Sequence, residues 1–227
     1  MYVYDINAIL MRCLRTKSGA EHLQTFKDVH ALLLRRGIHP KYCRMDNECS
    51  APIKQFIKDE DMDLQLTPTQ MHRRNWAERA IQTGKAHLIA GLVGINPNFP
   101  LHLWCRLIPQ CEQTLNMMRP THINPKISAD TYLQGTHDFN KVPLAPPRIL
   151  TVIHKSPDTR ETYAPHGLKE WYVGGAPEHY RCFDIWCPDT RWLRQGETVR
   201  FSPMNTFSRV YPHMKTSPVP YMNSLPP

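Results

Sequence analysis

The chain has 227 residues, enough for one or two domains with a sizeable core. Hydrophobic residues make up 41% of it and charged residues 21%, which excludes a chain that is disordered throughout. The 28 Lys and Arg outnumber the 20 Asp and Glu, and the resulting formal charge of +8 favours a polyanionic partner such as nucleic acid.

Cysteine usage and hydropathy exclude further classes. Seven cysteines are an odd number in a long chain without a signal peptide, so we expect reduced thiols in an intracellular protein. No apolar run approaches the roughly 20 residues that a transmembrane helix needs, and the N-terminus lacks the charged region and cleavage site of a secretory signal. We therefore expect a soluble protein that is neither secreted nor embedded in a membrane.

The N-terminal residues begin with a strand signal and continue with a helix signal. Residues 2–14 are rich in β-branched, aromatic and aliphatic side chains, which favours a strand. Ser18 with Glu21 three residues later forms a capping box, and apolar residues then recur at helical spacing. Two arginines and Gly37 end this helix, because cations and glycine suit a helix C-terminus.

The next segments alternate strand and helix. Residues 41–45 form a short strand that delivers Asp46 to its C-terminal end, and a helix follows over 50–58. Another strand covers 63–67, and a third helix covers 75–92. This order predicts an α/β sandwich with helices packed on the sheet.

Proline and glycine mark the elements that follow. Residues 101–118 have helical periodicity, with a kink expected at Pro109. A short helix begins at Ser128 and ends near Gly135, and the proline-rich residues 142–148 read as a linker. We therefore place the α/β core at residues 1–141.

Beyond the linker, short aromatic strands replace the helices. They lie at 149–154, 170–173, 180–186, 191–194 and 199–201. This pattern predicts a small antiparallel β-barrel domain over 149–203, followed by a disordered, proline-rich tail over 204–227. Trp171, Tyr172, Tyr180, Phe183, Trp186 and Trp192 are six of its aromatic residues. Exposed rings of this kind stack on bases, but a small barrel fills its interior with such residues, so we expect most of them to be core.

Two carboxylates are candidates for phosphoryl-transfer chemistry. Asp46 ends a strand, and Glu78 lies in the first turn of the third helix. Carboxylate oxygens on adjacent elements are the ligands by which a protein holds Mg²⁺, which activates an attacking oxygen and neutralises phosphate charge. The alternative is that both residues are solvated surface acids.

The third helix adds a polar stripe to this pair. Glu78, Gln82 and Lys85 are four and three residues apart and therefore share one face. Beside that face lie the apolar or small residues Ala77, Ile81, Gly84, Leu88 and Leu92. Such a stripe suits a metal-bound phosphate with neighbouring backbone contacts, although an ordinary amphipathic helix has the same pattern. Gly84 should cost the helix roughly 1 kcal/mol relative to alanine.

Five segments together resemble the integrases of copia-type LTR retrotransposons. These segments are 44–50, 72–81, 98–104, 119–126 and 178–183. The resemblance covers residues 1 to about 205. It implies a ribonuclease H-like core, that is, a mixed sheet with flanking helices, which joins element ends to target DNA through an Asp, Asp, Glu triad.

The resemblance assigns roles to particular residues. Asp46 matches the second Asp and Glu78 the Glu, which implies a Mg²⁺ or Mn²⁺ site. Arg73 and Arg74, with Gln82 and Lys85 on the polar stripe, are the expected DNA contacts. DNA partners, a homo-oligomer and a nuclear location are also implied.

The chain departs from the family pattern at its start. The first catalytic Asp of the family lies on the first core strand, whereas residues 2–10 match the second strand, and Asp5 matches a non-catalytic position. We expect that first strand and a zinc-binding module to lie upstream of Met1. The metal site should therefore be weak and catalysis incomplete. The alternatives are a non-enzymatic DNA-binding or scaffold remnant of an integrase and an unstable product without function.

Overall fold

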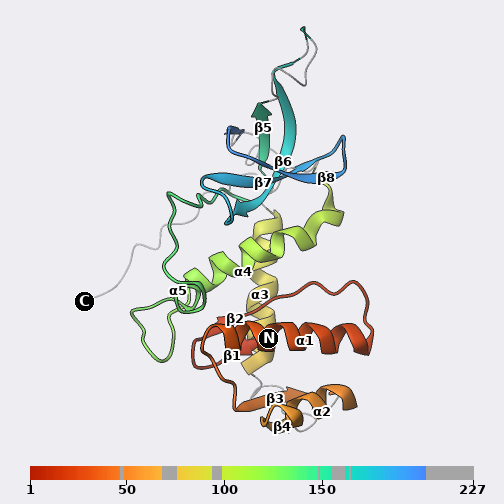
Figure 1. The fold of residues 1–227 in the computed structure, drawn as a ribbon, viewed down its shortest axis with the longest axis vertical. Coiled ribbons are helices and arrows are strands. Elements are labelled where there is room, and N and C mark those ends of the chain that lie inside the picture. Colours follow the sequence, from red (N-terminus) through yellow and green to blue (C-terminus); the bar gives the residue numbers. More distant parts are fainter. Residues whose placement is uncertain are drawn as a thin grey trace, which may run out of the picture.

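The computed structural model describes residues 1–46, 49–67, 76–93, 99–147, 149–154, 162–163 and 165–202. The molecule is elongated, with a small parallel β-pair at one end, helices in the middle and a five-stranded antiparallel sheet at the other end (Figure 1). It is therefore a mixed α/β protein. In the described part of the chain, no helix is long and apolar enough to cross a membrane. The predicted tail over 204–227 lies outside the described residues.

A hairpin forms the N-terminus. Strands β1 (Tyr2–Val3) and β2 (Ala8–Ile9) pair antiparallel. The turn between them places Asn7 in the left-handed region at φ 52°, which asparagine tolerates better than most residues. The prediction of one strand over 2–14 was therefore wrong, because this turn reverses the chain.

Helix α1 (Gly19–Arg35) follows its sequence signals closely. Its N-cap is Ser18, whose hydroxyl accepts a hydrogen bond from the Glu21 N–H at 3.3 Å. The reciprocal half of the predicted capping box differs, because the Glu21 carboxylate accepts from the N–H groups of Arg15 and Thr16 instead. At the other end Gly37 has φ 72°, as a glycine after a helix C-cap often does.

A βαβ unit comes next, close to the predicted bounds. Strands β3 (Tyr42–Asp46) and β4 (Asp63–Thr67) pair in parallel, with helix α2 (Ala51–Asp59) between them. The inner side chains of these strands pack with α1 and α2 around Ile53 and Ile57. Among the described residues, strand pairing leaves β1–β2 and β3–β4 as two separate sheets. The ribonuclease H-like arrangement of one mixed sheet stays a prediction.

The central helices join the two ends of the molecule. These are α3 (Trp76–Val93), the 3₁₀ helix η2 (Leu101–Leu107), α4 (Ile108–Met117) and the short α5 (Ala129–Gln134). Pro109 lies in the first turn of α4, where proline is tolerated, so a new helix begins there instead of one long helix kinking. In Figure 1, α3 runs along the long axis from the β3–β4 end towards the large sheet.

The large sheet has the strand order β8-β7-β6-β5-β9, with every pair antiparallel. Its strands are β5 (Leu150–His154), β6 (Gly167–Ala176), β7 (Cys182–Cys187), β8 (Trp192–Gly196) and β9 (Val199–Phe201). All five strands were predicted, although β6 is longer than expected. No β8–β9 pairing closes the sheet among the described residues, so the expected closed barrel is not seen there.

The large sheet packs against the helical part of the chain. Phe99, Leu103 and Leu107 share a buried cluster with Trp171 and Val173 of β6. In the segment predicted as a linker, the Ala145 carbonyl accepts a hydrogen bond from the Gln110 amide at 2.6 Å. Residues 142–147 thus lie along α4 and β6, and the division into two domains stays a prediction.

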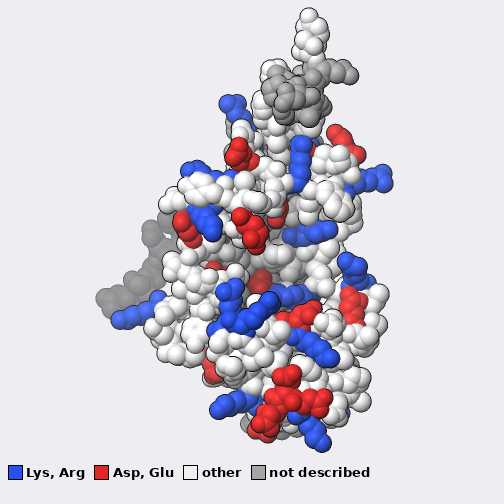
Figure 2. Space-filling model, in the orientation of Figure 1, with Lys and Arg blue, Asp and Glu red and all other residues white. Residues whose placement is uncertain are grey.

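Charge is unevenly distributed over the visible face. Figure 2 shows Lys and Arg side chains along its whole length, whereas acidic side chains gather most densely at the end formed by β3, β4 and α2. That end contains the exposed acids Asp59, Glu60, Asp61 and Asp63. The α2–β4 turn is therefore the most acidic part of this face.

Candidate nucleic-acid and metal site

Asp46 lies at the C-terminal end of β3 and is exposed. Strand alternation explains this, because Cys43 and Met45 point into the cluster beneath α1 and α2, so Arg44 and Asp46 point outward. The register partner of Asp46 on β4 is Thr67. The structure therefore places this carboxylate on the outer surface of a parallel pair, at the end where its strands finish.

Glu78 lies in the first turn of α3 and is half-buried. A carboxylate is favourable there because the helix dipole is positive at that end. Gln82 and Lys85, four and seven residues further on, are both exposed. The three side chains thus follow one face of α3, as expected for a polar stripe, while their contact with DNA stays a prediction.

The buried face of α3 differs from the predicted one. Ala80 and Gly84 are buried, whereas Ile81 is 54% exposed. Ala80 packs with Ile9 and Leu115 in a small cluster. Small residues are buried here because the N-terminal hairpin approaches the helix closely, and the larger Ile81 is turned outward.

Gly84 has a packing role that the sequence did not reveal. A Cβ at this position would lie 3.0 Å from Met11 Sδ and 3.7 Å from Ile9 Cγ2. The glycine therefore allows the hairpin to lie against α3. The cost of Gly84 in helix propensity is therefore accompanied by closer packing of the hairpin on α3.

The described structure shows no metal-binding group around the two candidate carboxylates. Two carboxylates, Asp46 and Glu78, have the right chemistry for Mg²⁺ or Mn²⁺, which prefer hard oxygen ligands. Within the described ranges, no group of three or more His, Cys, Asp or Glu side chains comes close enough to hold an ion. A Mg²⁺ or Mn²⁺ site at Asp46 and Glu78 therefore stays a prediction. Arg73 and Arg74, the other expected DNA contacts, lie outside the described residues.

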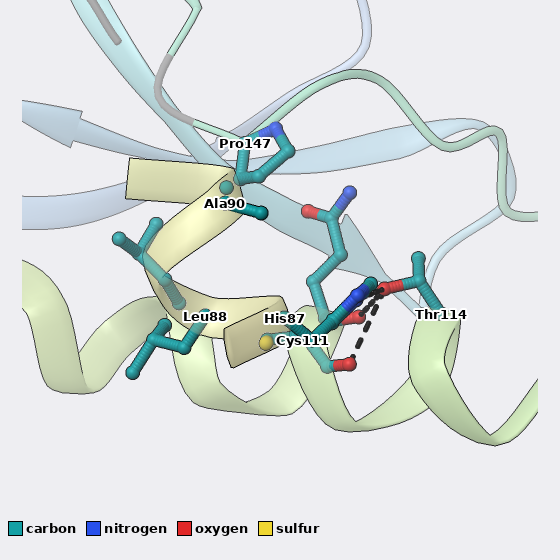
Figure 3. A pocket seen from close by; sticks show the side chains of 9 residues that line it. His87, Leu88, Ala90, Cys111, Thr114 and Pro147 are labelled. Atoms are coloured by element: carbon teal, nitrogen blue, oxygen red, sulfur yellow. Dashed lines mark hydrogen bonds between the residues drawn. The ribbon is translucent and has the colours of Figure 1, made fainter. Parts of the chain in front are cut away.

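A small pocket lies between α3 and α4 (Figure 3). It has a volume of about 190 Å³ and is lined by Leu88, Ala90, Cys111 and Pro147, among others. On its wall His87 Nε2 lies 3.1 Å from the Thr114 hydroxyl, which itself donates to a main-chain carbonyl of α4. The pocket has room for a small apolar group and offers little to a charged substrate.

The aromatic residues of the large sheet divide into two groups. Trp171, Tyr172 and Phe183 are buried, and the half-buried Trp186 packs against the cluster that contains Trp171, so four of the six rings contribute to core packing. Tyr180 is 65% exposed and Trp192 is 74% exposed. Burial raises the pKa of Tyr172 to about 12, and its hydroxyl accepts a hydrogen bond from the Ala145 N–H at 3.3 Å.

Sequence reasoning missed two polar residues of α4 that hold the hairpin. Asn116 is 1% exposed, and its side-chain amide pairs with both the N–H and the C=O of Ile9, each at 2.9 Å. Glu112 accepts a hydrogen bond from the Met11 N–H. It also forms an ion pair with Arg12, in which Arg12 Nη1 lies 2.7 Å from Glu112 Oε2. A helix pattern shows which positions are buried, but it does not show that a buried amide will replace a strand partner.

No family model matches the chain, and no curated protein matches its sequence. Among solved structures, a simian T-cell lymphotropic virus intasome in complex with the PP2A regulatory subunit B56 gamma is similar with a TM-score of 0.31 and 12% identity. That alignment covers 83% of this chain and 68% of the other. A likeness of this degree does not establish a shared fold.

Proposed function

We propose that the chain is an integrase-like DNA-binding protein whose Asp46 and Glu78 form an incomplete site for Mg²⁺ or Mn²⁺. The observation that carries this proposal is the outward face of α3, where Gln82 and Lys85 follow Glu78 in successive turns and are exposed. Lysine and glutamine contact phosphate oxygens without reading base sequence. The net charge of +8 supports the same partner.

Binding by phosphate contacts has a measurable signature. Each contact releases condensed counterions, so affinity for a short duplex should fall steeply between ~50 and ~200 mM salt. Fluorescence anisotropy of a labelled duplex measures this dependence. Binding that does not change with salt would contradict the proposal.

A single substitution tests the role of the polar stripe. Lys85→Gln should weaken duplex binding at low salt and lower the logarithmic salt slope by about 1. The matched control is Lys58→Gln, which removes an exposed lysine of α2 beside the acidic turn. Equal losses in both variants would place the DNA elsewhere on the surface.

Two carboxylates are too few for two-metal catalysis. Two-metal phosphoryl transfer places ions about 3.5 to 4 Å apart, with carboxylates shared between them. Asp46 and Glu78 alone leave such a pair short of oxygen ligands. We therefore expect weak Mn²⁺ binding that Asp46→Asn removes, and no strand transfer by this chain. Joining of DNA ends that survives Asp46→Asn would show that the chemistry belongs to other residues.

These tests distinguish a failure of DNA binding from a failure of metal binding. Loss of duplex binding would remove the proposal entirely, including the element-end and target DNA partners. Binding without Mn²⁺ affinity would instead leave the non-enzymatic alternative, a DNA-binding remnant of an integrase. A homo-oligomer and a nuclear location belong to the same proposal, and sedimentation of the pure chain checks the first of these.

A further inference from the structure

Three rings from distant parts of the chain meet on one exposed surface. Tyr4 lies in the β1–β2 turn, Trp76 is the first residue of α3, and His122 follows α4. The ring centroids of Tyr4 and Trp76 are 5.3 Å apart, and those of Tyr4 and His122 are 4.7 Å apart. Tyr4 is 51% exposed and Trp76 is 50% exposed. We call Tyr4, Trp76 and His122 the aromatic cluster.

The backbone beneath the aromatic cluster is firmly held. The Asp5 carbonyl accepts hydrogen bonds from the N–H groups of His122 and Ile123, at 3.0 and 3.2 Å. Arg119 Nε donates to the Asn7 carbonyl at 2.7 Å, which ties the turn to the end of α4. Two rings of the cluster are therefore positioned by the fold before any partner arrives.

The rings of Tyr4 and Trp76 cover each other only in part. Tyr4 and Trp76 meet at an interplanar angle of 78°, so the edge of one ring lies against the face of the other. About half of each side chain stays in water. Such an arrangement exposes apolar π-surface that a core would have covered, and contiguous exposed apolar surface commonly marks a binding site.

Charge decides which partner suits this surface. The Arg119 guanidinium lies 5.9 Å from the centre of the Tyr2 ring, next to the cluster. On α3, Arg79 and Lys85 follow Trp76, and both are exposed. Aromatic rings among cations are the combination by which proteins bind unpaired nucleic acid, with bases on the rings and phosphates on the cations.

We propose that the aromatic cluster is a stacking site for unpaired bases of single-stranded DNA. The inference goes beyond the proposed duplex binding, because bases in a duplex already stack on each other and offer no free face to Tyr4 or Trp76. The polar stripe of α3 would contact duplex phosphates, while the cluster at the start of the same helix would hold bases that have left a duplex.

The test compares the affinities of the full chain for a labelled oligothymidine and for a duplex of equal length. Because stacking on one ring contributes about 1 to 3 kcal/mol, Tyr4→Ala combined with Trp76→Ala should weaken oligothymidine binding at least about fivefold. Duplex affinity should change less than twofold. Trp76→Phe should retain most of the affinity, since it keeps an aromatic face. Trp192→Ala is the matched control, because Trp192 is 74% exposed on the large sheet.

Tryptophan fluorescence reports directly on contact between a base and Trp76. Oligothymidine should quench part of the tryptophan fluorescence, and that part should be missing in Trp76→Phe and present in Trp192→Phe. Full oligothymidine affinity in the double variant would overturn the inference while leaving duplex binding intact. Absence of any oligothymidine binding would also overturn it. Dissociation of an oligomer by Trp76→Ala, with unchanged oligothymidine affinity, would instead identify a protein interface.

Discussion

The large sheet and the N-terminal hairpin find hydrogen-bond partners for their backbone N–H and C=O groups in different ways. In the large sheet, four antiparallel ladders connect five strands, and a side-chain pair inside the sheet crosses from β6 to β8. In the N-terminal hairpin, the outer edge of β2 has no neighbouring strand in the described structure and is completed by Asn116 and Glu112 of α4. The strands of the large sheet thus support each other through shared ladder bonds, whereas the free edge of β2 is completed by side chains of a helix.

The largest effect should come from the side-chain pair inside the large sheet. Glu170 is fully buried, and Arg194 holds its carboxylate with two hydrogen bonds, one of them 2.7 Å long. Arg194→Met leaves a buried carboxylate without its partner, so we expect a loss of about 3 to 5 kcal/mol in the free energy of unfolding. Denaturant unfolding measures this loss.

Two further variants separate the charge from the packing. Arg200→Met removes an exposed arginine of β9 and should change stability by less than about 0.5 kcal/mol. Replacing both Glu170 and Arg194 by methionine should recover much of the loss, because no buried charge remains. If Arg194→Met alone changes the free energy of unfolding only slightly, the strand ladders stabilise the sheet without this pair.

A slightly smaller effect is expected from the hairpin. Asn116→Leu keeps the volume of the side chain but leaves the N–H and C=O of Ile9 unpaired, at a cost of about 2 to 4 kcal/mol. Hydrogen exchange at the Ile9 amide should become much faster, whereas amides of β6 should keep their protection. Asn140→Leu, at an exposed position, is the control. An unchanged Ile9 amide would mean that another group completes this edge.

Much of the secondary structure could be predicted from local patterns. Ser18 marks the start of α1 through its cap, and the strand over 63–67 agrees with β4 because turn residues bound a short alternating run. The hairpin was missed because the signal for its turn is a single asparagine in a left-handed conformation, Asn7, inside a strand-like run. Local patterns thus locate elements better than they locate reversals.

The candidate site shows what one sequence leaves undetermined. Asp46 and Glu78 were placed correctly on their elements, but periodicity did not distinguish Ala80 from Ile81 as the buried residue of α3. Close approach of the hairpin selects the smaller side chain, and that approach is a tertiary property. The aromatic cluster was missed for a related reason, because Tyr4 and Trp76 are far apart in sequence and meet only in the fold.

The close approach of the hairpin to α3 can be tested at Gly84. Gly84→Leu should destabilise the protein by about 1 to 3 kcal/mol, since the added atoms meet Met11 and Ile9 at contact distance. Gly84→Ala should be nearly neutral, because gained helix propensity offsets the close contact with the flexible end of Met11. At Gly91 of the same helix nothing lies within 4 Å, so Gly91→Ala should stabilise by up to about 1 kcal/mol. Thermal unfolding of the three variants checks this order, which fails if Gly84→Leu is tolerated.

The smallest effect concerns pH and the second side chain that holds the hairpin. Burial raises the pKa of Glu112 above its ordinary value of 4.5, and Arg12 and the Met11 N–H oppose this only in part. The folded protein therefore binds this proton more tightly than the unfolded chain does. The stability from Glu112 is fully present below the unfolded pKa and is lost as pH rises through the folded pKa. Wild type should lose stability relative to Glu112→Gln over that range, as thermal unfolding at a series of pH values would show.

The opposite sign at Glu21 provides the control for this titration. Hydrogen bonds from Thr16 and Arg15 lower the pKa of Glu21, so its contribution is present above the unfolded pKa and is lost as pH falls through the folded pKa. Wild type should therefore lose stability relative to Glu21→Gln on acidification, the reverse of the Glu112 pair. Both carboxylates accept backbone N–H groups near the hairpin and α1, but only Glu112 is buried. Equal signs in the two comparisons would show that burial does not control Glu112, and that the edge of the hairpin is open to water.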